Sequence, residues 1–463
     1  MSGLRANALG LRLVSTIGVA SAAPGYSLAA ALGVVALAAG TGLPATLLLA
    51  FLPMAGIACA FDQFNRIDPD CGTVFAWVSR AFGPTWGWLT GWTVIAADVV
   101  VMASLAQVAA QYALALFGCS AAQHPLLAQA VGVGWIAAMT WLCSRGIAFS
   151  ARLQGALLLL ELIVLVVLAA VLLRTVYAAP WPQSAPPSLA WFWPGNLSAR
   201  ALLDALGVAI FLYWGWDTAL NVNAESHNPQ RTPGRAALLA TLVLLAVFLF
   251  VATAAVAWRG PTFLAAHPDD ALAALAAEAF AAPWDKLLAV VVLTSAVAAT
   301  QTTILPTART ALSMAQKGVL PQVFATIHPV QQVPTHATLW MGAVSVAWYL
   351  ALAQLTPRVG AVSLQALDLL VAFYYGLTGF ACAWHFRRNA ATPLLFVLRI
   401  AAPLASGLAL LAVMAGLVLW PSGAVEGVGP LAVAMAFALL LLGFVLLLAQ
   451  RRASPAAAFW RGR

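Results

Sequence analysis

The sequence predicts an all-helical membrane protein with about twelve transmembrane helices. Of its 463 residues, 63% are hydrophobic and only 8% are charged, whereas about 25% of the residues in an average soluble domain are charged. The mean hydropathy is +0.94. A transmembrane helix needs about 20 apolar residues, so twelve of them with short loops account for the whole chain. This composition excludes a soluble protein, a disordered chain and a disulfide scaffold.

We place the helices where long apolar runs are bounded by charged residues, proline or glycine. The expected spans are 13–39, 42–63, 85–117, 125–143, 149–173, 200–222, 236–258, 285–308, 335–356, 362–386, 393–420 and 428–450. Four longer connections contain proline, tryptophan or charged residues, and short amphipathic helices are expected in some of them. These connections are 64–84, 174–199, 259–284 and 309–334.

An even number of spans puts both termini on the same side of the membrane. With the termini in the cytoplasm, 17 of the 22 lysines and arginines fall in inner loops and tails. The five outer ones are Arg174, Arg200, Arg259, Lys286 and Arg358. This positive-inside bias explains the net charge of +8, so no nucleic-acid partner is expected. The alanine- and leucine-rich composition is typical of GC-rich bacteria, so we expect the lipid bilayer of a bacterial inner membrane.

The N-terminus allows a second interpretation. Arg5, Arg12 and the run Ala20-Ser21-Ala22 imitate a signal peptide with its cleavage site. The apolar stretch continues to about Ala39, which is longer than a signal peptide requires, so we favour a transmembrane span. Cleavage would remove one span and invert the charge count.

Two spans carry an interruption near the middle. The first contains Ala20-Ser21-Ala22-Ala23-Pro24-Gly25, in which Pro24 lacks an amide hydrogen and clashes with the carbonyl of Ala20. The sixth contains Tyr213-Trp214-Gly215-Trp216-Asp217. Irregular backbone is tolerated inside a membrane only where it is buried or lines a cavity. Each interruption alone could be a simple kink, but such a pair, five spans apart, is typical of an inverted-repeat transporter.

Four acidic residues fall inside spans: Asp98, Glu161, Asp217 and Asp368. Each charge at the bilayer centre costs about 2.5–3.5 kcal/mol, and no lysine or arginine is predicted deep in any span. The acids are therefore protonated part of the time, or they face a cation that binds reversibly. For Asp98, a neutral carboxyl bonded to a helix backbone remains the alternative. Asp368 is expected near the outer interface, where water would reach it.

Two further polar or aromatic groups have two interpretations each. Thr300, Thr302 and Thr303 could hold Na⁺ or orient a substrate, or could bond to their own helix. The aromatic residues of the sixth span could stack on a cation or serve as ordinary packing.

The chain shows no catalytic or metal-binding pattern. The cysteines form no CxxC pair, and the histidines lie in loops or at span ends. No HExxH, Walker A or GxSxG sequence occurs in the structural context that its function requires. We therefore expect no cofactor, no metal and no enzymatic activity. A membrane-embedded transferase stays a remote alternative, and a channel is disfavoured because rings of pore-lining charge are absent.

Four stretches resemble the amino acid–polyamine–organocation (APC) family of permeases, over nearly the whole chain. They are the loop 61–92 with Pro69-Asp70-Cys71-Gly72-Thr73 and Phe82-Gly83-Pro84, the loop Glu225 to Pro233, the run Lys317-Gly318-Val319-Leu320-Pro321, and Tyr375-Gly376-Leu377-Thr378. Together they are similar to that family's characteristic loops.

The resemblance implies a LeuT-like fold of two inverted five-helix repeats followed by two helices. The chain would then divide into a cytoplasmic tail 1–12, repeats 13–177 and 200–388, the last two helices 393–450, and a tail 451–463. Substrate would lie between the two interrupted helices, and access to it would alternate between the sides of the membrane.

By the resemblance, the backbone around Ser21–Pro24 would receive a substrate carboxylate and the break at Trp214–Trp216 its ammonium group. Phe211 would be a gating aromatic residue, Asp217 would sense protons or a cationic substrate, and Asp98 would line the side-chain pocket. The candidate substrate-binding residues are Ala20, Ser21, Ala22, Ala23, Pro24, Gly25, Asp98, Phe211, Tyr213, Trp214, Gly215, Trp216 and Asp217. The candidate coupling residues are Glu161 and Asp217.

The sequence departs from the family pattern at two places. Family members carry G-x-G in the first break, where this chain has Ala20 to Gly25, so an amine without a carboxylate becomes a possible substrate. Glu161 falls where many proton-coupled members have a lysine. It could carry the proton itself or bind Na⁺.

We expect a secondary transporter of amino acids or related amines, with a proton as the coupling ion and sodium as the alternative. The acids favour cationic substrates such as arginine, lysine or polyamines. A neutral or bulky hydrophobic amino acid is the alternative, and symport and antiport both remain open.

Overall fold

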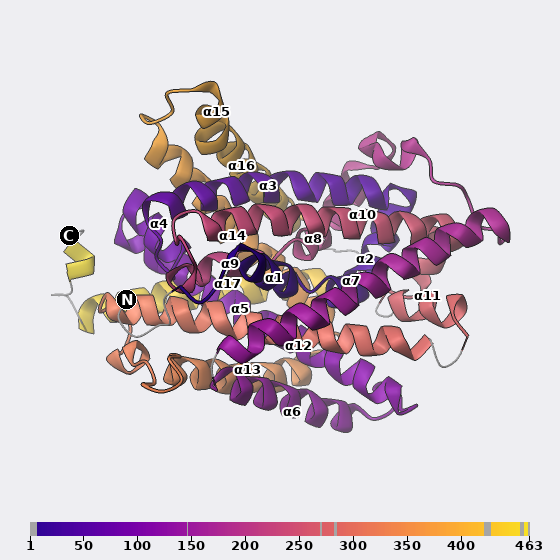
Figure 1. Cartoon of the computed structure of the whole chain (residues 1–463), viewed down its shortest axis with the longest axis horizontal. Helices are drawn as coiled ribbons and strands as arrows, with labels where there is room; N and C mark the ends of the chain where they lie inside the picture. The colour runs from indigo at the N-terminus through magenta and orange to yellow at the C-terminus, as the bar shows by residue number, and fades with distance from the viewer. Residues whose placement is uncertain are drawn as a thin grey trace.

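The computed structural model describes residues 7–145, 147–268, 271–281, 285–420, 427–453 and 458–461. This part of the chain is helical and contains no strand beyond one isolated bridge between Leu9 and Ser226. The long helices lie side by side along the long axis of the molecule, and both termini lie at the same end (Figure 1). We call this the termini end, and the other the opposite end.

The first half of the bundle contains seven α-helices in the described residues. They are α1 (Leu11–Ala22), α2 (Pro24–Ala39), α3 (Leu43–Ile67), α4 (Val74–Phe82), α5 (Pro84–Leu116), α6 (Pro125–Cys143) and α7 (Ile147–Ala178). Helix α4 is the kind of short helix expected between two spans; its apolar face packs against α5.

The second half begins with the short helices η2 (Leu189–Phe192) and η3 (Pro194–Asn196). It continues with α8 (Ala199–Leu212), α9 (Thr218–Asn221), η4 (Asn223–Glu225), α10 (Thr232–Ala266), α11 (Ala271–Ala279), α12 (Asp285–Gln316), η5 (Gln322–Ala325), α13 (Thr335–Leu355) and α14 (Val359–Phe386). The chain ends with α15 (Pro393–Phe396), a π-helical turn Val397–Ala401, α16 (Ala402–Leu419), α17 (Val428–Ala453) and η7 (Ala458–Arg461).

Ten segments of the described chain are long and apolar enough to cross a membrane. One of them, Leu11–Ile67, is 57 residues long and contains α1, α2 and α3. At about 1.5 Å per residue such a segment is much longer than one crossing of a ~30 Å hydrocarbon core. The 14-residue helix α8 is too short to be counted among the ten. The total of twelve crossings and the division into repeats stay predictions.

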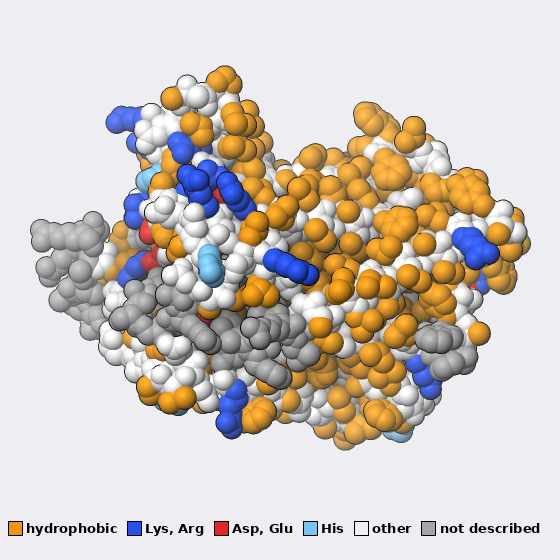
Figure 2. Space-filling model, in the orientation of Figure 1, with side chains coloured by type: hydrophobic (Ala, Val, Ile, Leu, Met, Phe, Trp, Pro, Cys, Tyr) orange, Lys and Arg blue, Asp and Glu red, His pale blue; other side chains and the backbone are white. Residues whose placement is uncertain are grey.

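The helices differ in how deeply they are buried. Helices α5 and α14 are buried over most of their length and form the centre, whereas α6, α16 and α17 bury only a few positions. Their outer faces are apolar, and Figure 2 shows hydrophobic side chains covering most of the bundle, with lysine and arginine gathered mainly toward the termini end. An apolar belt with charge at its edge is what a lipid-embedded protein requires.

Helix α12 is longer than expected. The sequence places the end of this span at residue 308 and Arg309 in an inner loop, but the helix continues to Gln316 and leaves Arg309 only 3% exposed. The helix can continue because Glu225 supplies the buried guanidinium with an ionic partner. The prediction of a loop at Arg309 is therefore wrong.

Candidate functional site

The first break lies between α1 and α2, as the sequence predicts, but it is only one residue wide. Ala23 has φ 47° and ψ 71°, a left-handed conformation that is uncommon for a residue other than glycine. The amide of Ala23 donates to the carbonyl of Val19 at 3.1 Å, and the amide of Ser27 donates to the carbonyl of Ala23 at 2.8 Å. Helical hydrogen bonds therefore run up to the break from both sides.

The second break is wider. Helix α8 ends at Leu212 and α9 begins at Thr218, with turns between them. Gly215 has φ +107°, and a Cβ atom added there would lie 2.9 Å from the carbonyl carbon of Ser21. The hydroxyls of Ser21 and Thr218 share a hydrogen bond of 2.8 Å. The two breaks are thus in direct contact, and only glycine fits where they meet.

A small cavity lies between the breaks. It is lined by Ser21, Ala22, Tyr26, Ser27, Val101, Leu105, Phe211, Trp214, Ala299 and Thr303. These residues come from α1, α2, α5, the end of α8, the second break and α12, and none of them is charged. Half of the lining side chains are apolar, and most of the polar ones bond to the protein: Ser27 donates to the carbonyl of Ala22 at 2.6 Å, and Trp214 donates to the Tyr374 hydroxyl at 2.7 Å.

Glu161, on α7, caps the beginning of α2. Its Oε1 atom accepts a hydrogen bond from the amide of Gly25 at 2.5 Å and another from the hydroxyl of Ser295 at 2.8 Å. The Ser295 oxygen in turn accepts the amide hydrogen of Tyr26 at 3.1 Å. The glutamate is 1% exposed, and a carboxylate at a helix N-terminus is electrostatically favourable.

Asp98 and Asp217 lie together near the cavity but do not line it. The hydroxyl of Thr307 donates to Asp98 Oδ2 at 2.5 Å, and the hydroxyl of Tyr374 lies 3.5 Å from Asp217 Oδ2. Since Tyr374 also accepts the hydrogen bond from Trp214, it connects the cavity wall with Asp217.

Several predicted site residues have other surroundings. Tyr213 packs against Phe51 and Phe248, and Trp216 packs against Phe61 and Tyr375. The hydroxyls of Thr300 and Thr302 donate to carbonyls one turn earlier in α12, which is the second interpretation given above. Ala20, Ala23, Pro24 and Gly25 belong to the break without lining the cavity. Asp368 is 1% exposed, so the expectation that water reaches it at an interface is wrong.

The sequence analysis missed six residues at this place. They are Tyr26, Ser27, Val101, Leu105, Ser295 and Ala299. Helical spacing could have found some of them: Val101 and Leu105 follow Asp98 by three and seven positions, and Ser295 and Ala299 precede Thr303 by eight and four. Residues at these spacings share one face of a helix.

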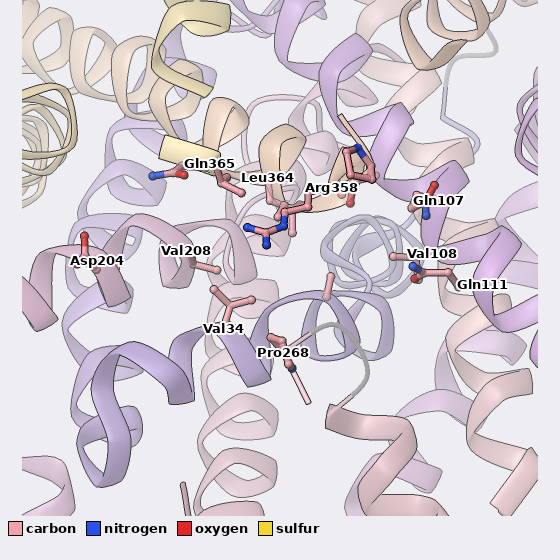
Figure 3. A pocket seen from close by; sticks show the side chains of 16 residues that line it. Val34, Gln107, Val108, Gln111, Asp204, Val208, Pro268, Arg358, Leu364 and Gln365 are labelled. Carbon is pink, nitrogen blue, oxygen red and sulfur yellow. The ribbon is translucent and has the colours of Figure 1, made fainter. Parts of the chain in front are cut away.

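A larger pocket opens toward the opposite end of the molecule, between α2, α5, α8 and α14 (Figure 3). Arg358 reaches into it, and Gln107, Gln111 and Gln365 line it. We call it the vestibule. Ser104 belongs to its wall and accepts a hydrogen bond from the hydroxyl of Tyr26 at 2.9 Å.

Tyr26 and Phe211 separate the vestibule from the cavity. Their rings meet edge to face with centroids 5.8 Å apart, and both residues line the cavity on its own side. Sequence analysis names Phe211 as the gating aromatic residue. In the structure the ring of Phe211 contacts that of Tyr26; the gating role stays a prediction.

The termini end is held by polar contacts. Arg309 and Glu225 form an ion pair in which both side chains are at most 3% exposed. Asp70 accepts hydrogen bonds from Ser313 at 2.8 Å and from Lys317 at 3.0 Å. Glu225 and Lys317 lie in two of the stretches that carry the resemblance, so these loops meet around α12.

Known proteins resemble this chain along most of its length. A family model described as amino acid permease matches residues 11–451. An uncharacterized transporter of Mycobacterium tuberculosis is 31% identical over 318 residues, which is 67% of this chain and 64% of the relative. The chain thus spans slightly less than two thirds of that relative's length.

Two relatives with named activities differ in substrate. The L-methionine/branched-chain amino acid exporter YjeH of Escherichia coli is 29% identical over 40% of this chain and 41% of its own length. A cationic amino acid transporter of Arabidopsis thaliana is 24% identical over 71% of this chain and 56% of its own length. The match of the family model to nearly all of the chain, on a helical bundle with two touching breaks, shows that the chain belongs to the amino acid permease family, within the APC permeases.

Proposed function

We propose that this protein is a secondary transporter that carries a neutral amino acid with an apolar side chain across the membrane. The observation that carries the proposal is the cavity between the breaks, whose walls combine apolar side chains with neutral polar ones and hold no charged one. A buried cationic side chain would need a carboxylate in direct contact. The substrate ammonium group would face the carbonyls at the C-terminal end of α8, where the helix dipole is negative.

Alternating access would use the two ends of the bundle in turn. The vestibule leads from the opposite end to Tyr26 and Phe211, and the ion pair of Arg309 with Glu225 closes the termini end. Opening one closure while the other holds would move the substrate across the membrane. In this proposal the termini end faces the cytoplasm, as the distribution of lysine and arginine predicts.

A cationic amino acid is the second candidate, and one observation favours it. Asp217 is partly buried and is linked to the cavity wall through Tyr374 and Trp214, and the buried Asp98 accepts a hydrogen bond from Thr307. A long basic side chain that passed Trp214 would reach these carboxylates. The sequence alone favours this candidate; we put the neutral amino acid first because no charged side chain lines the cavity.

We propose the proton as the coupling ion, with Glu161 and Asp217 as its candidate carriers. Glu161 is 1% exposed and accepts a hydrogen bond from the Gly25 amide, and the partly buried Asp217 lies within hydrogen-bonding distance of Tyr374. Sodium remains the alternative ion, and a sodium gradient at constant pH separates the two.

Uptake into proteoliposomes tests the proposed function. Labelled leucine, methionine, phenylalanine, arginine, lysine and putrescine are offered with an acid-outside pH gradient and then without it. We expect gradient-driven accumulation of leucine or methionine, and none in liposomes without protein. Accumulation of arginine or lysine alone would replace the first candidate by the second, and accumulation of no compound would overturn the proposal.

Substitution of one acid separates the two candidates. In the second candidate Asp217 binds the substrate cation, so Asp217→Asn lowers arginine uptake at least tenfold. In the first candidate Asp217→Asn lowers only the pH dependence of leucine uptake. Wild-type uptake and wild-type pH dependence in this variant would remove Asp217 from both schemes.

A further inference from the structure

We propose that Glu161 occupies, in the empty transporter, the place that the substrate carboxylate takes when substrate is bound. Binding of a carboxylate-bearing substrate then transfers one proton from water to Glu161. This inference rests on the proposed function and names the step that couples substrate to proton at the same site.

The first turn of α2 offers amide donors at the first break; Gly25 does not line the cavity itself, but the residues that follow it, Tyr26 and Ser27, do. The first amides of any helix lack acceptors within the helix, and together with the helix dipole they form a natural carboxylate site. Here Pro24 has no amide hydrogen. The amide of Gly25 donates to Glu161, that of Tyr26 to Ser295, and that of Ser27 to the carbonyl of Ala23. Every amide of this turn therefore already has an acceptor in the protein.

A second carboxylate cannot join this arrangement unchanged. Glu161 Oε1 lies 2.5 Å from the Gly25 nitrogen, so a substrate oxygen on the same amide hydrogen would take the position of that atom. Two carboxylates at one site repel one another, and the resulting free energy favours protonation of one of them. Glu161 must therefore lose its charge or leave before the substrate carboxylate can bind to Gly25.

The exchange of partners balances. The hydrogen bond from the Gly25 amide to Glu161 breaks, and the amide hydrogen binds the substrate carboxylate. A proton from water adds to the Glu161 carboxylate. The new O–H group can donate to the Ser295 oxygen, which accepts one hydrogen bond from Tyr26 and has a second lone pair. The Ser295 hydroxyl, which donates to Glu161 in the empty protein, would then donate to the substrate carboxylate. One substrate and one proton enter together.

The groups that act on Glu161 are few. In the part of the chain that the structure describes, its carboxyl group interacts with the Gly25 amide of α2 and the Ser295 hydroxyl of α12, and no charged side chain of α1, α2, α10 or α12 forms an ion pair with it. The nearby titratable hydroxyl of Tyr26 points to Ser104 instead. A pH response of this step is therefore assigned to Glu161 itself.

The exchange at the Gly25 amide would also affect the position of Tyr26. Gly25 and Tyr26 are consecutive, so the residue released from Glu161 adjoins the residue that separates the vestibule from the cavity. Exchange of Glu161 for the substrate carboxylate would thus change the contact of Tyr26 with Phe211, which separates the cavity from the vestibule.

The test compares ligands with and without a carboxylate. Binding of leucine and of leucinol to the purified wild-type protein is measured from pH 5.5 to 8, together with proton uptake from a weakly buffered indicator solution. Arginine and agmatine serve as the equivalent pair if the uptake panel identifies a cationic substrate. We expect the affinity for leucine to rise as pH falls, by at most about tenfold per pH unit, with uptake of one proton per leucine bound. The affinity for leucinol should stay constant, without proton uptake.

The variant Glu161→Gln keeps an oxygen that can accept from the Gly25 amide but cannot take up a proton. We expect its affinity for leucine to be independent of pH and its proton uptake to be lost. Glu278→Gln on α11, whose partly exposed carboxylate pairs with Arg259, is the matched control and should keep proton uptake on leucine binding. Equal pH dependence for leucine and leucinol in the wild-type protein, or a wild-type pH slope in Glu161→Gln, would overturn the inference while leaving the transport activity intact. Failure of every amino acid to bind would instead overturn the proposed function, and the inference with it.

Discussion

The two ends of the molecule are closed by different kinds of contact. At the termini end, a buried ion pair and the bonds of Asp70 hold loops from distant parts of the chain against α12. Toward the opposite end, one aromatic pair and one hydroxyl bond separate the cavity from the vestibule. Removing one partner of a buried ion pair costs about 3–5 kcal/mol, whereas one neutral hydrogen bond contributes about 0.5–1.5 kcal/mol. The termini end is therefore the more costly one to open.

The largest effect is expected from Arg309→Ala. This change leaves the Glu225 carboxylate buried without its cation, so we expect a loss of about 3–5 kcal/mol in the free energy of unfolding or a permanently opened termini end. Cys71 reports on opening, because its thiol is fully buried and lies 3.8 Å from the carbonyl of Arg309. Burial raises the pKa of the Cys71 thiol to about 12, so it reacts slowly with alkylating reagents near pH 8.

Alkylation of Cys71, quantified by mass spectrometry, and thermal unfolding in detergent measure this effect. We expect faster alkylation in Arg309→Ala than in the wild-type protein, and faster alkylation at higher pH in both. The double variant Arg309→Ala/Glu225→Ala should recover part of the stability, since no buried charge is left alone. Unchanged alkylation and stability in the single variant would mean that the ion pair does not hold this end closed.

An intermediate effect is expected from a substitution at Gly215, where the two breaks contact each other. Gly215→Ala would place a Cβ atom 2.9 Å from the Ser21 carbonyl and force a strained φ of +107° on alanine. We expect a loss of about 1–3 kcal/mol and of most uptake. Gly134→Ala on α6 is the matched control, because a Cβ atom there meets no atom within 4 Å. A Gly215→Ala protein that transports normally would show that contact between the breaks is unnecessary.

The smallest effect is expected from Tyr26→Phe. The ring and its contact with Phe211 remain, and only the hydrogen bond to Ser104 is lost. A change of about 0.5–1.5 kcal/mol corresponds to roughly a two- to tenfold change in the half-saturation concentration for uptake from the vestibule side. Ser104→Ala should give a similar change, and the two changes should not add up in the double variant. Additive effects would show that the two hydroxyls act separately.

Much of this architecture could be predicted from the sequence because membrane helices obey strong local rules. The break at Pro24 follows from a missing amide hydrogen, and that at Gly215 from a residue that alone tolerates φ +107°. Neither inference needs a distant part of the chain. The extent of α12 could not be predicted in the same way, because Arg309 is buried only by virtue of Glu225, 84 residues earlier.

The site was only partly predictable for the same reason. The sequence singles out Glu161 as an acid within a span, but its partners Gly25 and Ser295 lie more than 130 residues away on either side. The threonines of α12 attract attention because they are clustered, yet the single Ser295 on the same helix makes the contact with Glu161. The apolar half of the cavity wall gives no local indication of a site, because 63% of the chain is hydrophobic.

Glu225 also connects the closed end of the bundle to the start of the chain. Its carboxylate pairs with Arg309, while its carbonyl oxygen accepts hydrogen bonds from the amides of Ala8 and Leu9 at 2.8 and 3.0 Å. One residue thus forms a three-way junction between the N-terminal segment, the stretch after α9 and helix α12. We expect the contacts of such a junction to break together. The termini end would then be either closed or open, without intermediate positions. Binding of a partner to the segment before Leu9, or a change in its length, would then alter how readily the termini end opens.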